Sequence, residues 1–184
     1  MANNCFYTIK AVAKEKSALE RLVSIMEYKD PEYFIYRCFS VSGDITKEGD
    51  YYVANLTGDV AWSCTKWFET EEKPEELIVL KYEDGWKCTR PVFGTAHYIT
   101  LDLLCKKLEI GLELYSEESG CCFQEHYHVD ANGNILIKDC VEWTEDWWDE
   151  ENDCERDEPV YTGGFDDYCC FAHAKEIFGE LEMA

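Results

Sequence analysis

The stretch NCFYTIKAVAKEKSALERLVSIMEY, residues 4–28, contains the two hydrophobic patterns that decide the fold. Residues 4–12 are rich in aromatic and β-branched side chains, which predicts a first strand. Residues 16–28 repeat apolar side chains at helical spacing, at Leu19, Leu22, Val23 and Met26. The sequence therefore predicts a strand followed by an amphipathic helix.

The rest of the chain continues the pattern with short apolar runs between turn residues. A second helix is predicted at 100–108 and a final one at 166–178. Asp84-Gly85 separates two apolar runs, 77–82 and 86–95, as in a hairpin. Further strands are predicted at 33–41, 50–56, 111–117, 120–129 and 135–143.

The order of these elements indicates the fold class. A β-α-β-β-α-β order predicts an α+β protein of the ferredoxin-like, or split-βαβ, type. We expect an antiparallel sheet with both early helices on one face, extra C-terminal strands and a terminal helix. The composition becomes strongly acidic near residue 146, so we predict a domain at 1–145 and an acidic extension at 146–184.

The charge is distributed unevenly along the chain. Residues 1–107 hold 14 Lys and Arg against 17 Asp and Glu, whereas residues 108–184 hold 3 against 22. The C-terminal part therefore carries most of the formal net charge of −22. Because nucleic acids and anionic membranes repel such a protein, the composition predicts a basic protein as the partner, with no direct nucleic-acid or membrane contact.

The cysteines and the apolar segments indicate the compartment. The N-terminal residues lack the pattern of a secretory signal, and no apolar stretch is long enough to cross a bilayer. The 11 cysteines are odd in number and include no C-x-x-C spacing, which argues against a disulfide framework and a zinc ribbon. We expect a soluble cytoplasmic protein whose thiols are mostly free.

Several short motifs resemble the Api-type, ferredoxin-like proteins of phages and plasmids. They are Asn3-x-Cys5 with Ile9, Trp62-Ser-Cys-Thr-Lys-Trp67, Phe93-x-Thr95-Ala96, and Tyr115-x-Glu117 followed by Gly120 and Phe123. Trp62–Trp67 is similar to a Trp-Gly-Thr-Lys-Trp signature, with Cys64 in place of the glycine. The resemblance covers residues 3–145. It implies a ferredoxin-like fold and a mobile element in a bacterial host, but no particular chemistry.

The densest charge lies in residues 142–158, which hold ten carboxylates and one arginine. As a helix, this stretch would carry one net charge per about 2.8 Å, close to the one per about 3.4 Å of a DNA strand. Embedded tryptophans can stack on a partner's arginines; the alternative is a solvated loop. The predicted partner-binding residues are Glu142, Glu145, Asp146, Trp147, Trp148, Asp149, Glu150, Glu151, Asp153, Glu155, Asp157 and Glu158.

The predicted strand 120–129 offers a possible metal site. His126 and His128 lie about 6.6 Å apart on one strand face, where they can share a metal. Cys121 and Cys122 are near in sequence, but Cys122 is about 13 Å from His126 along a straight strand, too far to join them. Half-exposed histidines on a strand are the simpler interpretation, so no metal is predicted.

The predicted last helix offers a possible nucleophile. Cys169, Cys170 and His173 fall within one helical turn, and a thiolate–imidazole pair can attack an electrophile. A low thiol pKa needs electropositive surroundings, which this acidic region lacks. We therefore predict no catalytic residue and no cofactor.

These features together predict an inhibitor rather than an enzyme. We expect an acidic DNA mimic that blocks DNA binding by a host defence nuclease, such as a CRISPR effector or a restriction enzyme, in the cytoplasm of the bacterial host. Such enzymes hold DNA in positively charged channels. In size, acidity and origin, the protein resembles anti-CRISPR and anti-restriction inhibitors. Two alternatives stay open: a Cys/His metal protein or enzyme using residues 121–128, and an accessory interaction module.

Overall fold

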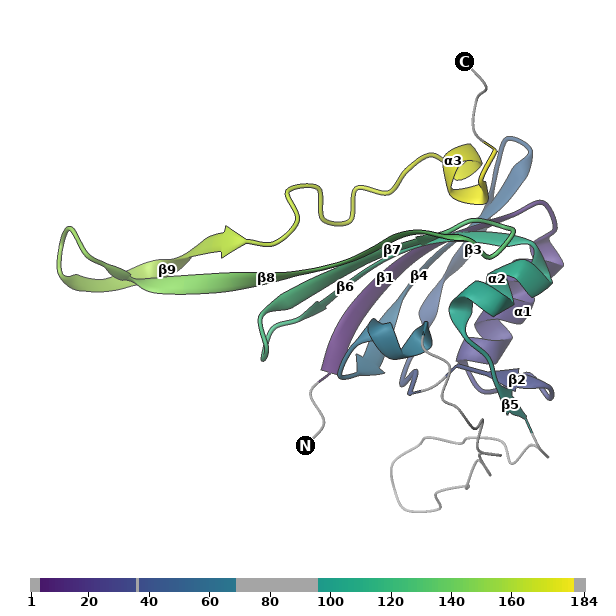
Figure 1. The fold of residues 1–184 in the computed structure, drawn as a ribbon, viewed down its shortest axis with the longest axis horizontal. Helices are drawn as coiled ribbons and strands as arrows, with labels where there is room; N and C mark the ends of the chain where they lie inside the picture. The colour runs from purple at the N-terminus through teal and green to yellow at the C-terminus, as the bar shows by residue number, and fades with distance from the viewer. Residues whose placement is uncertain (1–3, 36, 69–95, 181–184) are drawn as a thin grey trace.

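The computed structural model describes residues 4–35, 37–68 and 96–180. Its main sheet has the strand order β3-β4-β1-β6-β7-β8-β9, and every neighbouring pair is antiparallel (Figure 1). The strands are β1 (Asn4–Ala13), β3 (Ser42–Glu48), β4 (Tyr51–Ala61), β6 (Ile110–Glu118), β7 (Phe123–Val129), β8 (Ile135–Asp149) and β9 (Cys154–Gly163). β2 (Tyr33–Phe34) and β5 (His97–Tyr98) form a separate parallel pair. The predicted α+β class and antiparallel sheet are confirmed.

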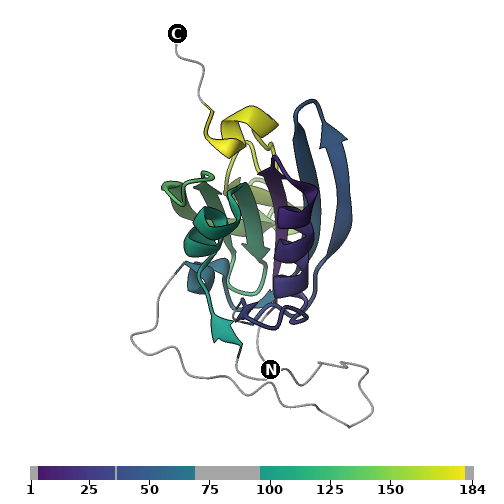
Figure 2. The ribbon, with the colours of Figure 1, turned by 90° about the vertical axis from the view of Figure 1, so that its right-hand side faces the viewer.

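One face of the sheet is covered by two helices, α1 (Lys16–Met26) and α2 (Leu101–Leu108), which lie side by side in Figure 2. Alternate residues of β1 point to this face because strand side chains alternate. The main core therefore joins Tyr7 and Ile9 of β1 to Leu22 of α1 and Leu104 of α2. The predicted position of both helices on one face is confirmed.

The opposite face of the sheet is covered by the C-terminal chain. After β9 the chain continues along this face to α3 (Ala174–Phe178) (Figure 1). Ile177 of α3 packs on Val12 and Val53, which alternate with the residues of the main core. Three aromatic rings stand edge-on to Tyr115, with centroids 5.3–6.3 Å away: Phe165, Tyr168 and Phe171.

β8 and β9 form a long hairpin that extends away from the rest of the sheet (Figure 1). β7 pairs with β8 only as far as the Phe123–Glu142 pair. From Trp143 onward β8 pairs with β9 alone, so the distal half is a two-stranded ribbon. The predicted boundary between residues 145 and 146 lies within β8.

The strands before residue 61 differ from the sequence prediction. Residues 33–41 were expected to form one strand, but β2 covers only two residues, and Arg37 has a φ of 55° that interrupts an extended chain. Residues 42–48, which lie between the predicted strands 33–41 and 50–56, form strand β3. β3 is an edge strand that is almost wholly exposed, so it lacks the apolar alternation that reveals a half-buried strand.

The last helix is shorter than the predicted 166–178. Cys169 has a φ of 61°, which an α-helix cannot continue through, and α3 begins only at Ala174. Phe165, Tyr168 and Phe171 instead pack on the sheet from an irregular segment. Burial of these rings outweighs the helical preference of the segment.

Two further predictions concern a hairpin around Asp84-Gly85 and the absence of a membrane-spanning segment. The hairpin expected around Asp84-Gly85 lies outside the described residues. None of the described helices has the length and apolar composition needed to cross a membrane.

Candidate functional site: the acidic hairpin

The distal hairpin is closed by a turn that its own side chains hold. The Asp149 carboxylate accepts hydrogen bonds from the backbone N–H groups of Glu151 and Asn152, at 3.0 and 3.2 Å, and from the Asn152 amide at 2.8 Å. These hydrogen bonds, those from Asn152 first, lower the pKa of Asp149. Asp149 therefore shapes the turn and stays charged.

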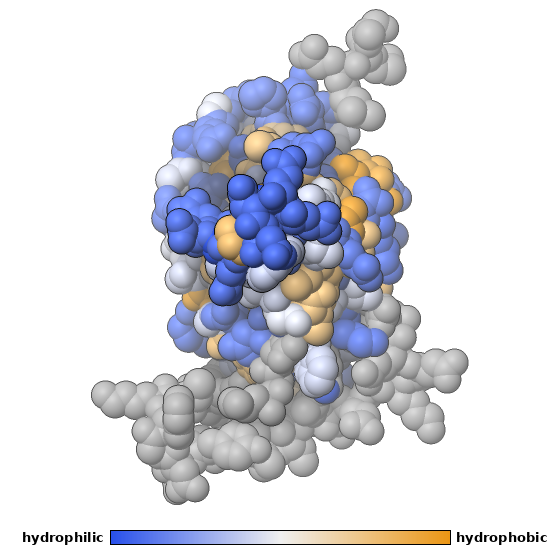
Figure 3. Space-filling model, turned by 90° about the vertical axis from the view of Figure 1, so that its left-hand side faces the viewer, coloured by the Kyte–Doolittle hydropathy of each residue, from blue (hydrophilic) through white to orange (hydrophobic). Residues whose placement is uncertain are grey.

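The structure brings the twelve predicted residues together on this ribbon. Glu142–Asp149 lie in β8, Glu150–Asp153 in the turn, and Glu155–Glu158 in β9. All are exposed except Asp149, which is half-buried. Seen from its tip, the hairpin is mainly hydrophilic (Figure 3). The acidic stretch is thus a β-ribbon; the helix considered from the sequence does not form.

The ribbon keeps the high charge density that a helix would have had. A strand rises about 3.3 Å per residue, so the eight residues Glu142–Asp149 span about 26 Å. The ten carboxylates and one arginine then give one net negative charge per about 3 Å, comparable to the one per about 3.4 Å of a DNA strand. Arg156 helps to stabilise the turn, because its Nε donates to the Trp148 carbonyl at 3.0 Å and its Nη1 lies 3.9 Å from Asp149.

Exposed aromatic side chains lie among these charges. Trp147 and Trp148 are 46% and 49% exposed, and a register irregularity between Asp146 and Trp148 interrupts the regular pairing there. The Trp147 indole N–H donates to the Glu145 carboxylate at 3.0 Å. The apolar surface of both rings is free to contact a partner.

Sequence reasoning missed the contribution of β9. Tyr161 is 62% exposed and Val160 43%, and they pair with Glu145 and Asp146 of β8. Both lie beyond the acidic stretch, but the β-rich run Val160-Tyr161-Thr162 before Gly163-Gly164 is a strand signal that could have placed them opposite it.

The histidines of β7 do not meet at a common point. The His126 Nε2 atom lies 2.8 Å from Glu113, and its ring stacks on Tyr115 at 4.1 Å. His128 instead approaches the Ile177 carbonyl at 3.4 Å. Cys122 lies in the turn before β7, with a φ of 55°. Within the described residues, no group of neighbouring metal ligands includes these side chains.

The helix on which a thiol–imidazole pair was considered does not extend over these residues. Cys169, Cys170 and His173 precede α3, so helical spacing does not align them. Burial raises the pKa of the Cys169 thiol, which disfavours the reactive thiolate.

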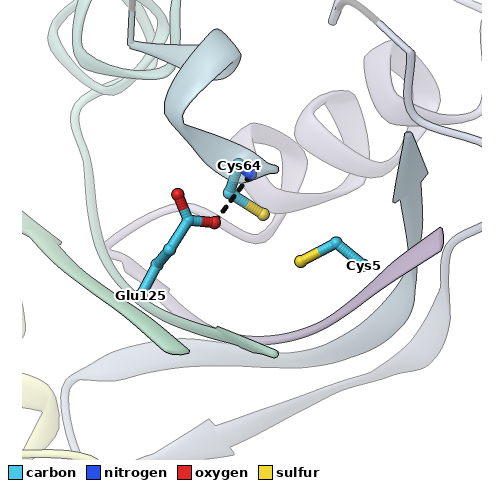
Figure 4. A group of neighbouring side chains, drawn as sticks. All are labelled: Cys5, Cys64 and Glu125. Carbon is cyan, nitrogen blue, oxygen red and sulfur yellow. Dashed lines mark hydrogen bonds between the residues drawn. The ribbon is translucent and has the colours of Figure 1, made fainter. Parts of the chain in front are cut away.

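Another cluster, which was not predicted from the sequence, lies on the face of the sheet that α1 and α2 cover. Cys5, Cys64 and Glu125 place potential ligand atoms within 4.8 Å of one another and are fully buried (Figure 4). The Glu125 carboxylate already accepts hydrogen bonds from Ser63, Thr65, Ser116 and Tyr127 side chains and from the backbone N–H of Cys64. Both oxygens of Glu125 are thus occupied by donors from its own chain, so this carboxylate has a structural role.

Glu125 instead anchors a short 3-10 turn, η1 (Cys64–Trp67), to β7. This turn carries the Trp62–Trp67 motif noted in the sequence. Trp67 is fully buried and stands edge-on to Tyr7 at 5.0 Å. Cys64 and Trp67 of the motif therefore have a structural role in the main core, whereas Trp62 is exposed.

Comparison with protein-family models, curated proteins and solved structures finds no match for this chain. The fold and the site define an α+β protein with an acidic, aromatic-bearing hairpin, and its function is argued from these features.

Proposed function

We propose that the protein is an acidic DNA mimic from a mobile element that inhibits a host nucleic-acid-binding defence enzyme, as anti-CRISPR and anti-restriction proteins do. One observation carries the proposal: ten carboxylates lie on a protruding ribbon with exposed Trp147 and Trp148. A high net charge keeps a protein soluble, but like charges gathered on one ribbon repel one another, and a basic channel attracts them.

The shape of the ribbon supports insertion into such a channel. The distal half of β8 and β9 is only two strands wide and is separate from the rest of the sheet in Figure 1. Carboxylates at its surface can meet the lysines and arginines that otherwise hold phosphates. Tryptophans can then stack on guanidinium groups once water is excluded.

The strand order supports the ferredoxin-like part of the proposal. Omitting β2, β5 and the two C-terminal strands β8 and β9, the sheet order is β3-β4-β1-β6-β7, with α1 after β1 and α2 before β6. The first four strands in that list follow the order of a split-βαβ unit. We propose membership of the Api-type family on this order and on the motifs, which implies a phage or plasmid protein acting in the bacterial cytoplasm.

A non-enzymatic role is supported by the state of the thiols. Burial raises the pKa of Cys64, Cys105 and Cys169. A thiol is a poor nucleophile when it stays protonated. The hairpin and its turn hold nine exposed carboxylates within one short stretch, which suits binding rather than chemistry.

Affinity capture tests this proposal. The protein is immobilised, bacterial lysate is applied at low salt, and bound proteins are eluted first with duplex DNA and then with salt. The proposal predicts that DNA displaces a nuclease or other DNA-binding protein, because both compete for one basic surface. Capture of a protein that DNA does not displace would favour an accessory interaction module instead.

A further inference from the structure

A hollow of about 310 Å³ lies at the base of the hairpin, where the ribbon leaves the sheet. Its lining includes Glu117, Gln124, Trp143, Glu145 and Tyr161. These side chains come from four successive strands, β6 to β9, so the sheet itself fixes their positions. We infer that this hollow receives an arginine side chain of the partner, an inference that rests on the proposed function only in taking the partner to be basic.

The hollow lies beside the C-terminal segment that covers the second face. Glu117 pairs with Gln124 in the ladder between β6 and β7. The Gln124 amide oxygen accepts a hydrogen bond from the Phe165 N–H at 2.9 Å, which marks the edge of that cover. The same amide donates to Glu117 at 2.7 Å and holds its carboxylate in place.

Two carboxylates supply negative charge to the hollow. One oxygen of Glu117 accepts from Gln124, and one oxygen of Glu145 accepts from the Trp147 indole N–H. Across the described parts of the chain, neither carboxylate forms an ion pair. Each therefore keeps acceptor capacity for a cationic ligand.

Two aromatic rings complete the hollow. Trp143 and Tyr161 lie with centroids 5.8 Å apart and planes inclined at 52°. Trp143 is only 7% exposed, and its indole N–H has no hydrogen-bond partner among the residues described. This ring is therefore a fixed wall of the hollow, and its indole N–H signal can report a change there.

A guanidinium group suits these walls better than an ammonium group does. It is planar, stacks on aromatic rings and offers five N–H donors that can reach two separate carboxylates. A volume of about 310 Å³ is at the lower limit of small-molecule sites, which span about 300–1,000 Å³, so the hollow fits one side chain rather than a cofactor.

The inference is tested on the protein alone with N-acetyl-arginine methylamide as the probe. Binding is followed in ¹H–¹⁵N spectra through the indole N–H signal of Trp143, assigned with Trp143→Phe. We expect a saturable shift of this signal. The matching citrulline derivative, which has the same shape without charge, should produce none.

Variants locate the binding to the hollow. Glu145→Gln and Tyr161→Ala should each weaken probe binding about tenfold, through loss of a charge-assisted hydrogen bond or of a stacking surface. Glu155→Gln removes the same charge from the hairpin outside the hollow and should leave binding unchanged. Equal binding of citrulline, or an equal loss with Glu155→Gln, would overturn the inference.

The outcome is separable from that of the proposed function. If the arginine probe does not bind, while charge reversal at the hairpin tip abolishes capture of a DNA-binding protein, the hollow is not an arginine site and the DNA mimic stands. If the probe binds at the hollow but tip reversal changes nothing, the arginine site stands and the DNA mimic does not.

Discussion

Three buried carboxylates of the sheet body and the carboxylates of the hairpin have opposite surroundings in this protein. In the body, Glu113, Glu125 and Asp130 are at least nine-tenths buried, and each accepts hydrogen bonds from side chains or backbone N–H groups of the body. On the distal hairpin, the carboxylates face water and only Asp149 is held by several donors. The three buried acids of the body therefore hold their own chain in place, whereas those of the hairpin are available to a partner.

The largest expected effect on stability comes from the most enclosed of these carboxylates. Glu125→Gln replaces one acceptor oxygen by an NH₂ group that faces the donors of Ser63, Thr65 and Ser116. We expect the free energy of unfolding to fall by about 3–5 kcal/mol, since a broken buried polar network costs that much. Urea denaturation followed by circular dichroism measures it.

The matched control for this variant lies on the hairpin. Glu155→Gln changes the same atoms at an exposed position and should alter stability by less than about 0.5 kcal/mol. Equal destabilisation by the two variants would show that body and hairpin carboxylates do not differ in role.

A smaller effect on stability is expected from the ionisation of Glu113, which lies on the face that the C-terminal chain covers. Burial opposes ionisation of Glu113, but hydrogen bonds from His126 and from the Ala172 N–H outweigh it and lower the pKa. A pKa lower in the folded protein than in the unfolded chain, about 4.3 there, stabilises the fold above that value. The contribution disappears as pH falls through the folded pKa.

Glu113→Gln should therefore reduce the loss of stability between pH 7 and acid pH. Thermal melts across pH 3–7 compare the variant with the wild type. Asp30 and Asp130 also have lowered pKa values, so the wild-type dependence is shared and only part of it should vanish. Identical pH profiles would contradict the assignment of Glu113.

A still smaller effect is expected from removal of the hairpin itself. Thr144 and Thr162 lie opposite each other, so an Asn-Gly turn can join them directly. Because the ribbon beyond Thr144 and Thr162 pairs with no other described strand, the shortened protein should lose less than about 1 kcal/mol of stability. Denaturation in urea checks this. Failure of the shortened chain to fold would mean that the hairpin is part of the body.

The last expected effect is a difference in alkylation rate between buried and exposed thiols. Cys5, Cys38, Cys64 and Cys105 are buried, whereas Cys121, Cys140, Cys154 and Cys170 are exposed. Alkylation of the native protein without reductant, mapped by mass spectrometry, should label the exposed group quickly and the buried group slowly. In denaturant, most of the 11 thiols should react; four or more disulfides would contradict the predicted reducing compartment.

The sequence predicts the body better than its edges. β1, α1, α2 and β6 have strong apolar periodicity, so their existence and order could be predicted. β3 could not, because an exposed edge strand needs no apolar pattern. The short α3 could not either, since the packing of Phe165 and Phe171 on Tyr115 is a tertiary contact that local propensity does not contain.

The acidic residues of the candidate site were identified from composition alone, but their arrangement was not. A stretch of carboxylates with interspersed tryptophans fits either a helix or a ribbon, and the choice depends on pairing with β9. The same pairing brings Tyr161 to Glu145 and creates the hollow at the base of the hairpin. Long-range register of this kind is absent from a single sequence.

The most direct test of the DNA-mimic account compares two sets of charge reversals of equal size. One variant reverses the charges of Glu150, Glu151 and Glu155 on the hairpin to lysine and leaves Asp149 to hold the turn. The other reverses Asp44, Glu48 and Asp50 to lysine at exposed positions of the body. The quantity measured is the affinity for the DNA-displaceable partner at fixed salt, beside a thermal melt of each variant. The account predicts about a 100-fold loss for the hairpin set, a much smaller loss for the body set, and unchanged melting for both. Equal affinities for the two folded variants would contradict it.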